Sequence, residues 1–211
     1  MSTIINADTS NGLKLTSDTS GEIKLQSAGA DIATVSSTGI AMASGKTLTG
    51  GGKILQVVET SYKTTATFNV TAFTATGVTA SITPSSASNK ILVMVKLDIG
   101  SSNGGNEEGA RTRLYKDGSN LTGAMGTDSG SREGSFITHP GYSGDGSAFV
   151  THFGQYLDSP STTSATTYTI YMRGHDASGS YPVYLNRSNS DSDKVTTPRG
   201  TCVMTLMEVA G

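Results

Sequence analysis

Few combinations of residues in this chain could carry out chemistry, and the clearest is a serine among glycines. Gly100-Ser101-Ser102-Asn103-Gly104 matches the G-x-S-x-G pattern of a nucleophilic serine and follows an apolar, alternating segment. A serine hydrolase needs a helix directly after this turn, whereas residues 105–109 have the composition of a loop. With 26 glycines in 211 residues the pattern is expected by chance, so we do not assign catalysis to it.

The histidines give little support for a metal site. His139, His152 and His175 are far apart in the sequence, and none has the i, i+2 or i, i+4 spacing of a ligand pair. His152 lies between Thr151 and Phe153 on an expected strand, where a packed or hydrogen-bonded side chain is the usual outcome. The alternative is a zinc ion on a trimer axis, where symmetry copies of one histidine meet.

Acidic residues form three further candidates for chemistry. Asp191-Ser192-Asp193 and Gly144-Asp145-Gly146 supply oxygen ligands for calcium, but neither continues into the twelve-residue EF-hand pattern. Glu107-Glu108 lies in a Gly-rich loop, whereas the carboxylate pair of a glycosidase needs rigid strands.

A phosphate-binding loop is not indicated either. Gly50-Gly51-Gly52-Lys53 lacks the first glycine and the final Ser or Thr of a P-loop. The sequence therefore predicts no enzyme, no cofactor and no metal.

Binding is better supported than catalysis. Residues 123–146 form a long segment rich in Gly and Ser that contains several aromatic and polar side chains. Aromatic rings beside polar groups suit the faces of sugars, and loops on a rigid sandwich are typical recognition surfaces. We therefore predict a surface recognition site at Phe136, His139, Tyr142 and Asp145. The alternative is a loop that becomes ordered only against neighbouring subunits.

The composition excludes several classes of protein. Charged residues make up 15% of the chain, the net charge is −2, and no run of Lys or Arg is present, so nucleic-acid binding is not expected. Cys202 is the only cysteine, which excludes a disulfide within the chain and fits a reducing cytoplasm. Residues 1–4 lack the basic start of a signal peptide, and no apolar segment approaches the ~20 residues of a membrane span.

Residues 1–49 show a weak repeat. Gly12, Gly21 and Gly39 lie nine or eighteen residues apart, with Ala30 at the missing step. Each unit combines a short apolar segment with a Ser/Thr-rich turn, which predicts strands of about three to five residues. The alternative is a flexible arm without regular structure, rich in Ser, Thr and Gly. Because each strand offers few apolar side chains, the arm should pack on copies of itself or on another protein.

A glycine hinge at residues 50–52 separates this arm from a knob at residues 53–211. The knob contains about nine expected strands and no segment with a 3.6-residue period, which indicates a sandwich or a barrel. Its clearest strand has apolar residues at every second position, at Ile91, Val93, Val95, Leu97 and Ile99. Residues 66–73 are expected to form one strand, and Pro182 predicts an edge position for residues 181–185.

The last segment, residues 201–209, is apolar on both faces. Cys202, Met204 and Leu206 project to one side, and Val203, Met207 and Val209 project to the other. A strand with this pattern should be central and covered on both sides. We therefore predict that a central strand or a trimer core contains Met204, Leu206 and Met207.

Several segments resemble structural proteins of marine phages. The N-terminal module of their tail fibres is similar to Ser2-Thr3-Ile4-Ile5-Asn6-Ala7-Asp8, Gly12-Leu13-Lys14-Leu15 and Gly21-Glu22-Ile23-Lys24-Leu25-Gln26. The knob domain of such proteins is similar to residues 86–93, 157–160, 166–173 and 205–210. Knobs of this kind resemble trimeric jelly rolls of the tumour-necrosis-factor/C1q type.

The resemblance implies an all-β fold, with a short-strand repeat arm followed by an antiparallel, homotrimeric jelly-roll sandwich. It implies a virion structural protein, made in the host cytoplasm, that docks on another virion protein through residues 1–49. The knob would project toward the host surface and bind polysaccharide there, without nucleic acid and without membrane insertion. One alternative is a capsid decoration protein, as a cement or head fibre that coats or stabilises the shell. Another is a carbohydrate-binding or polysaccharide-cleaving module.

Overall fold

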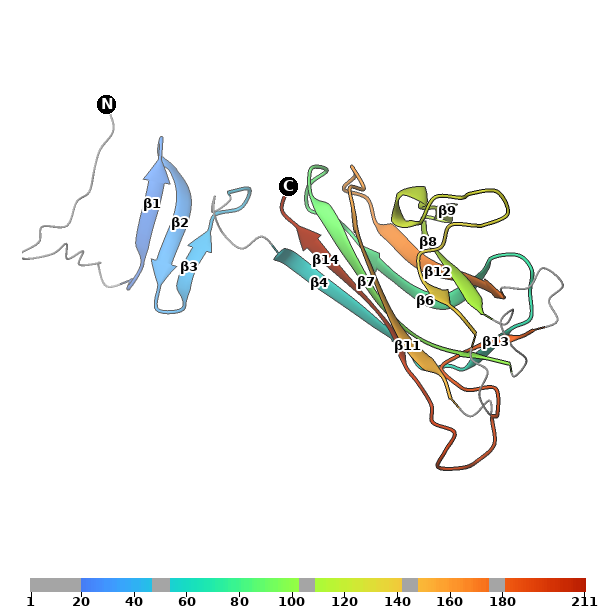
Figure 1. Ribbon diagram of the computed structural model, residues 1–211. Coiled ribbons are helices and arrows are strands. Elements are labelled where there is room, and N and C mark those ends of the chain that lie inside the picture. The colour runs from blue at the N-terminus through green and yellow to red at the C-terminus, as the bar shows by residue number, and fades with distance from the viewer. Residues whose placement is uncertain (1–19, 47–53, 103–108, 142–147, 175–180) are drawn as a thin grey trace, which may run out of the picture. The chain divides into compact units, whose positions relative to one another are not determined.

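The chain consists of two β-rich units. The computed structural model describes residues 20–46, 54–102, 109–141, 148–174 and 181–211. The two compact units are Met1–Gly52 and Lys53–Gly211 (Figure 1). The prediction of an all-β fold is confirmed, because the regular structure of the described residues is strands, apart from one short 3-10 turn, η1 (Thr122–Ala124).

The first unit contains a three-stranded antiparallel sheet in the order β1-β2-β3. The strands are β1 (Ile23–Ser27), β2 (Ala30–Ser36) and β3 (Gly39–Met42). Ala28 and Gly29 join the first two strands with φ angles of +50° and +78°, which are those of a tight two-residue hairpin turn. Among the described residues of this unit only Ala33 is buried, while Ile40 remains 66% exposed. The sheet therefore builds no core from its described residues.

The second unit is a sandwich of two antiparallel sheets. In the first sheet, β7 pairs with β11 on one side and with both β14 and β13 on the other. At the far side, β14 pairs with β4 and β13 pairs with β5. Across the second lie β6, β12, β8, and then β9 and β10 at the same edge. The strands of the first sheet are β4 (Ile54–Tyr62), β5 (Ala66–Phe68), β7 (Lys90–Ser101), β11 (Val150–Asp158), β13 (Val183–Leu185) and β14 (Cys202–Val209). Those of the second are β6 (Thr74–Ile82), β8 (Ala110–Lys116), β9 (Ser119–Asn120), β10 (Thr138–His139) and β12 (Thr166–Gly174).

The order of the strands is that of a jelly roll. From β6 to β8, and again from β10 to β12, successive strands alternate between the two sheets, and β13 and β14 then return the chain to the first sheet. The first strand of the sandwich, β4, pairs with the last, β14, so the chain closes on itself. The two four-strand series, β4-β14-β7-β11 and β6-β12-β8-β10, face each other across the core (Figure 1).

Alternating apolar residues from both sheets form the core. The inward side chains of β7 are 0–2% exposed, and they are Ile91, Val93, Val95, Leu97 and Ile99. From the second sheet, Tyr168, Ile170 and Met172 on β12 are all 0% exposed. Because successive side chains of a strand point to opposite faces, this period of two places one complete face of each strand in the core.

The last strand, β14, lies in the middle of its sheet between β4 and β7. Met204 and Leu206 belong to the inner face and are 0% exposed, whereas Met207 points to the outer face and is half-buried. The sandwich itself therefore covers only one of the two apolar faces of this strand.

A buried carboxylate fixes the end of β14. Glu208 is 0% exposed and accepts hydrogen bonds from Gln56 Nε2 at 2.6 Å, Asn89 Nδ2 at 2.6 Å, and the amide and hydroxyl of Ser85 at 2.6 and 2.8 Å. Burial opposes the ionisation of Glu208, but these hydrogen bonds outweigh it and hold its pKa at about 2. Glu208 thus joins β4, β14 and the segment between β6 and β7.

Two details of the expected strands are wrong. β13 is not an edge strand, because it pairs with β5 on one side and β7 on the other. Pro182 precedes the first paired residue, where no N–H is needed, and its carbonyl accepts a hydrogen bond from the Ser102 amide at 3.1 Å. The strand expected at residues 66–73 is shorter, since β5 ends at Phe68.

We predict that the two faces of β14 respond differently to the same charge. Leu206→Asp removes ~1.5–3 kcal/mol of leucine burial and adds an unpaired buried carboxylate, against a typical domain stability of ~5–15 kcal/mol. This variant should be largely unfolded by circular dichroism and urea titration. Met207→Asp, one residue away, should keep a folded sandwich. Equal stability of the two variants would contradict the assignment of the faces.

Candidate functional site

An apolar row crosses the outer face of the first sheet. One line of paired residues crosses β4, β14, β7 and β11, from Val57 to Met207, Leu92 and Leu157. Val57 is 55% exposed and Leu157 is 46% exposed, while the two middle side chains are half-buried. The sandwich therefore leaves a line of apolar side chains partly uncovered on this face.

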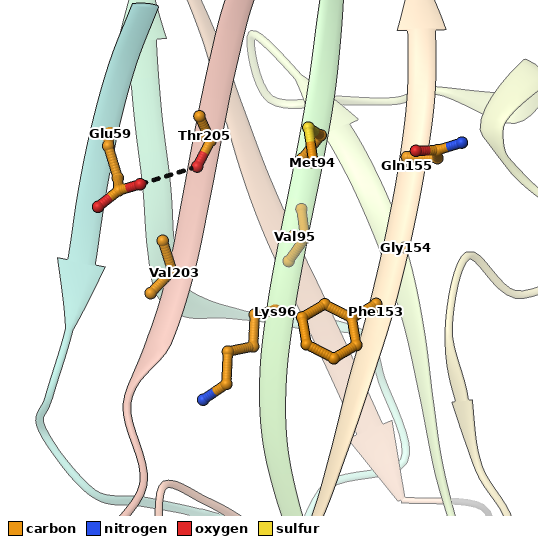
Figure 2. Close-up of a pocket in the computed structure, with 9 residues that line it drawn as sticks. All are labelled: Glu59, Met94, Val95, Lys96, Phe153, Gly154, Gln155, Val203 and Thr205. Atoms are coloured by element: carbon orange, nitrogen blue, oxygen red, sulfur yellow. Dashed lines mark hydrogen bonds between the residues drawn. The ribbon is translucent and has the colours of Figure 1, made fainter.

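Beside this row the same face is hollowed into a shallow groove of about 460 Å³. Figure 2 shows its lining, which consists of Glu59, Met94, Val95, Lys96, Phe153, Gly154, Gln155, Val203 and Thr205. Phe153 lies at the groove and is 76% exposed. Glu59 and Lys96 are the charged residues of the lining, and they lie on different strands (Figure 2). The groove therefore offers apolar contact and no pair of converging carboxylates.

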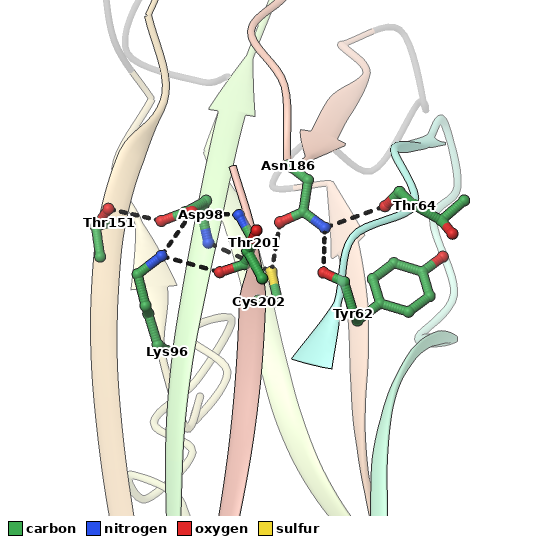
Figure 3. A network of polar contacts seen from close by, with 8 residues as sticks. All are labelled: Tyr62, Thr64, Lys96, Asp98, Thr151, Asn186, Thr201 and Cys202. Carbon is green, nitrogen blue, oxygen red and sulfur yellow. Dashed lines mark hydrogen bonds and ion pairs between the residues drawn. The ribbon is translucent and has the colours of Figure 1, made fainter. Parts of the chain in front are cut away.

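A polar network holds the strands at one end of this face (Figure 3). Asp98 is 2% exposed and accepts hydrogen bonds from Lys96 Nζ at 2.7 Å, Thr151 Oγ1 at 2.6 Å and the Thr201 amide at 2.9 Å. Burial alone would raise the pKa of Asp98, but these hydrogen bonds outweigh it and lower that pKa. Asp98 thus ties β11 and the start of β14 to β7.

The cysteine belongs to the same network. Cys202 Sγ donates to Asn186 Oδ1 at 3.0 Å, and Asn186 Nδ2 donates to the carbonyls of Tyr62 and Thr64 at 2.7 and 3.1 Å (Figure 3). Burial raises the pKa of the Cys202 thiol to about 11. A neutral, buried thiol is neither a nucleophile nor a metal ligand, so Cys202 has a structural role.

The predicted recognition site is only partly described, and one of its members lies elsewhere. Tyr142 and Asp145 are outside the described residues. His139 is 1% exposed, so its placement on a recognition surface is corrected: its side chain packs in the interior. Phe136 is half-buried and packs over Gly154, where a Cβ atom would lie 2.9 Å from its ring. Neither described residue presents an open aromatic face.

The structure brings together two histidines that the sequence did not connect. His139 Nδ1 lies 3.0 Å from His152 Nε2, and His139 Nε2 lies 3.2 Å from Ser101 Oγ. The two histidines are on strands of different sheets, β10 and β11, so neither their spacing nor a strand pattern could reveal the contact. Ser101 is 5% exposed, and with His139 also buried this serine–histidine contact is not open to a substrate.

The contact between the histidines requires at least one neutral ring. One ring must donate a proton and the other must accept it, whereas two protonated rings would place two N–H groups 3.0 Å apart. Burial lowers the pKa of His139 to about 4, and the neighbouring His152 adds to this effect. Burial also lowers the pKa of His152, although nearby Asp98 opposes it. At neutral pH the pair is therefore uncharged.

In the described ranges, no three His, Cys, Asp or Glu side chains gather as a metal site would require. That part of the chain also contains no helix long and apolar enough to cross a membrane. Ser102 occupies the nucleophile position of the G-x-S-x-G pattern, and its hydroxyl is buried without a hydrogen-bond partner among the described residues. It therefore has no general base there.

We predict that the histidine pair makes the knob sensitive to mild acid. Unfolded histidines bind protons near pH 6.5, while folded His139 does so near pH 4, so unfolding takes up protons between these values. The free energy of unfolding therefore has its full value above pH 6.5. As the pH is lowered below 6.5, it falls by about 1.4 kcal/mol per pH unit for each such proton. Urea titrations from pH 7.5 to 5 should show this slope, before the carboxylates titrate.

The control is His139→Gln, which lacks the titrating ring. This variant should be less stable at pH 7.5 because Ser101 and His152 lose a hydrogen bond, but its stability should change less between pH 6.5 and 5. An unchanged pH slope in the variant would contradict the role of the pair.

No protein-family model matches the chain, and no curated protein matches it either. What the geometry provides is a jelly-roll knob with an uncovered apolar sheet face and a buried histidine pair.

Proposed function

We propose that the chain is a structural protein of a phage particle, a homotrimeric fibre or spike. In this proposal residues 1–49 dock on another virion protein, and the knob projects for attachment to the host surface. Many weak contacts by several knobs then act together, so attachment needs avidity and no turnover. The observation that carries the proposal is the uncovered apolar face of the β4-β14-β7-β11 sheet.

The width of this face supports association with further copies of the same chain. The apolar row reaches from Val57 on β4 to Leu157 on β11, so it spans the sheet from one edge to the other. A second sheet face would be wide enough to cover this row. Another copy of the chain supplies such a face wherever the protein is made. Cyclic assembly buries such faces around one axis and leaves none open.

The proposed number of three copies comes from the resemblance of the knob to trimeric jelly rolls, and the strand order described above is compatible with it.

The arm gives independent support for assembly. In its described part Leu25 is 47% exposed and Ile40 is 66% exposed. A three-stranded sheet with so little buried surface is only marginally stable by itself. Packing on two copies or on a docking protein would supply the missing contacts.

We predict that a charge on the outer face abolishes assembly without unfolding the knob. Phe153→Glu should give a folded monomer, because its side chain is 76% exposed in one chain and contributes to the uncovered face. The wild-type protein should have the mass of three chains by native mass spectrometry or light scattering. Val195→Glu is the matched control, since Val195 is fully exposed outside the strands and should leave the trimer intact. A wild-type monomer would contradict the proposal.

A second prediction tests the place of the protein on a particle. Antibodies against the knob should label purified phage particles at the tail, and a chain consisting of residues 53–211 should fold but fail to join the particle. Label on the head would favour the decoration alternative. A truncated knob that still joined the particle would show that the arm is not the anchor.

A further inference from the structure

A cluster of three arginines lies on the outer face of the second sheet. Arg111 and Arg113 are on β8 and Arg173 is on β12, where it pairs across the strands with Arg111. All three alternate with buried residues such as Thr112 and Met172, so they share the face that points away from the core. This face belongs to the sheet opposite the apolar row, and it remains free in the proposed trimer.

An aromatic ring lies against two of these guanidinium groups. The Phe73 ring lies under Arg113, 4.1 Å from its Cζ, and 5.4 Å from the Cζ of Arg173. Tyr115 and Tyr171 stack beside them with ring centroids 3.8 Å apart and an angle of 19° between their planes. Phe73 holds the planar guanidinium group of Arg113, and more weakly that of Arg173, so these two arginines are preorganised before any ligand arrives.

The cluster carries more positive than negative charge. Glu133 accepts hydrogen bonds from Arg173 Nε at 3.2 Å and Nη2 at 2.5 Å, and from Arg111 Nη1 at 3.5 Å. All three arginines act electrostatically on this one carboxylate. Among the described residues no carboxylate lies within ion-pair distance of Arg113, and its buried Nε atom has no hydrogen-bond partner there.

We propose that this arginine–aromatic patch binds the carboxylate or sulfate group of an acidic saccharide. A guanidinium group offers two parallel N–H donors that match a planar carboxylate, and among the described residues no carboxylate pairs with Arg113. Tyr115 and Tyr171 provide ring surface for the apolar C–H face of the sugar. The inference rests on the proposed attachment function only in taking a host polysaccharide as the source of the ligand.

A saccharide fits this patch better than a nucleic acid. The patch has one arginine without a carboxylate partner among the described residues, which suits a single anionic group. Nucleic-acid binding depends on several phosphates contacted along a basic strip, whereas this chain has a net charge of −2.

The test uses the full chain and three defined polymers. Oligogalacturonate carries carboxylates, dextran sulfate carries sulfates, and neutral dextran carries neither; binding is measured by titration calorimetry. We expect binding to at least one acidic polymer and none to neutral dextran. Arg113→Gln should weaken that binding about tenfold, the loss of roughly one charge-assisted hydrogen bond. Arg199→Gln is the control, because Arg199 is 56% exposed on another segment and pairs with Asp191.

A second measurement does not depend on the variant folding correctly. The Nε–H resonance of Arg113 should shift when oligogalacturonate or dextran sulfate is titrated into the isotope-labelled protein. Absence of this shift, equal binding by Arg113→Gln, or equal binding of neutral dextran would each overturn the proposal. Tighter binding of single-stranded DNA than of either acidic polymer would also overturn it.

Particles separate this proposal from the proposed function. If purified protein binds the acidic polymers through Arg113 but particles without the protein still attach to cells, the saccharide site stands and the attachment role fails. If particles need the protein but attach equally well with Arg113→Gln, the saccharide site fails and the attachment role stands.

Discussion

The jelly roll depends on the insertion of β14 between β4 and β7, two strands that are far from it in the sequence. Two buried carboxylates fix this insertion at its ends. Asp98 binds the amide of Thr201 just before the strand begins, and Glu208 near its end binds side chains of β4 and of the segment before β7. Because each carboxylate is ionised and has several donors, loss of one donor would leave a buried charge poorly compensated.

The two faces of β14 have different surroundings. The inner face of β14 completes the core, with Met204 and Leu206 fully buried, while the outer face adds Met207 to an apolar row that the sandwich does not cover. The opposite sheet presents arginines and aromatic rings on its outer face instead. One chain thus has a partly uncovered apolar face on one sheet and a cationic face on the other.

Local patterns predicted much of the fold, and long-range contacts account for what they missed. The alternation from Ile91 to Ile99 identified β7, because side-chain period depends only on neighbouring residues. The edge position predicted for β13 was wrong, because a proline at one end of a strand does not show which strands pair with it. The pair His139–His152 joins two sheets, and the three arginines meet through strand register, so neither site has a signature in the linear sequence. Of the predicted recognition residues, His139 proved to be interior.

The reactivity of the single cysteine reports whether the last strand is in place in its sheet. Cys202 is 0% exposed, its hydrogen is donated to Asn186, and it is the first residue of β14. A thiol reagent in solution can reach it only after that strand has separated from its neighbours. The rate at which an intact protein consumes such a reagent therefore measures how often the last strand leaves the sheet. No label or substitution is needed for that measurement, because the sequence contains no other thiol.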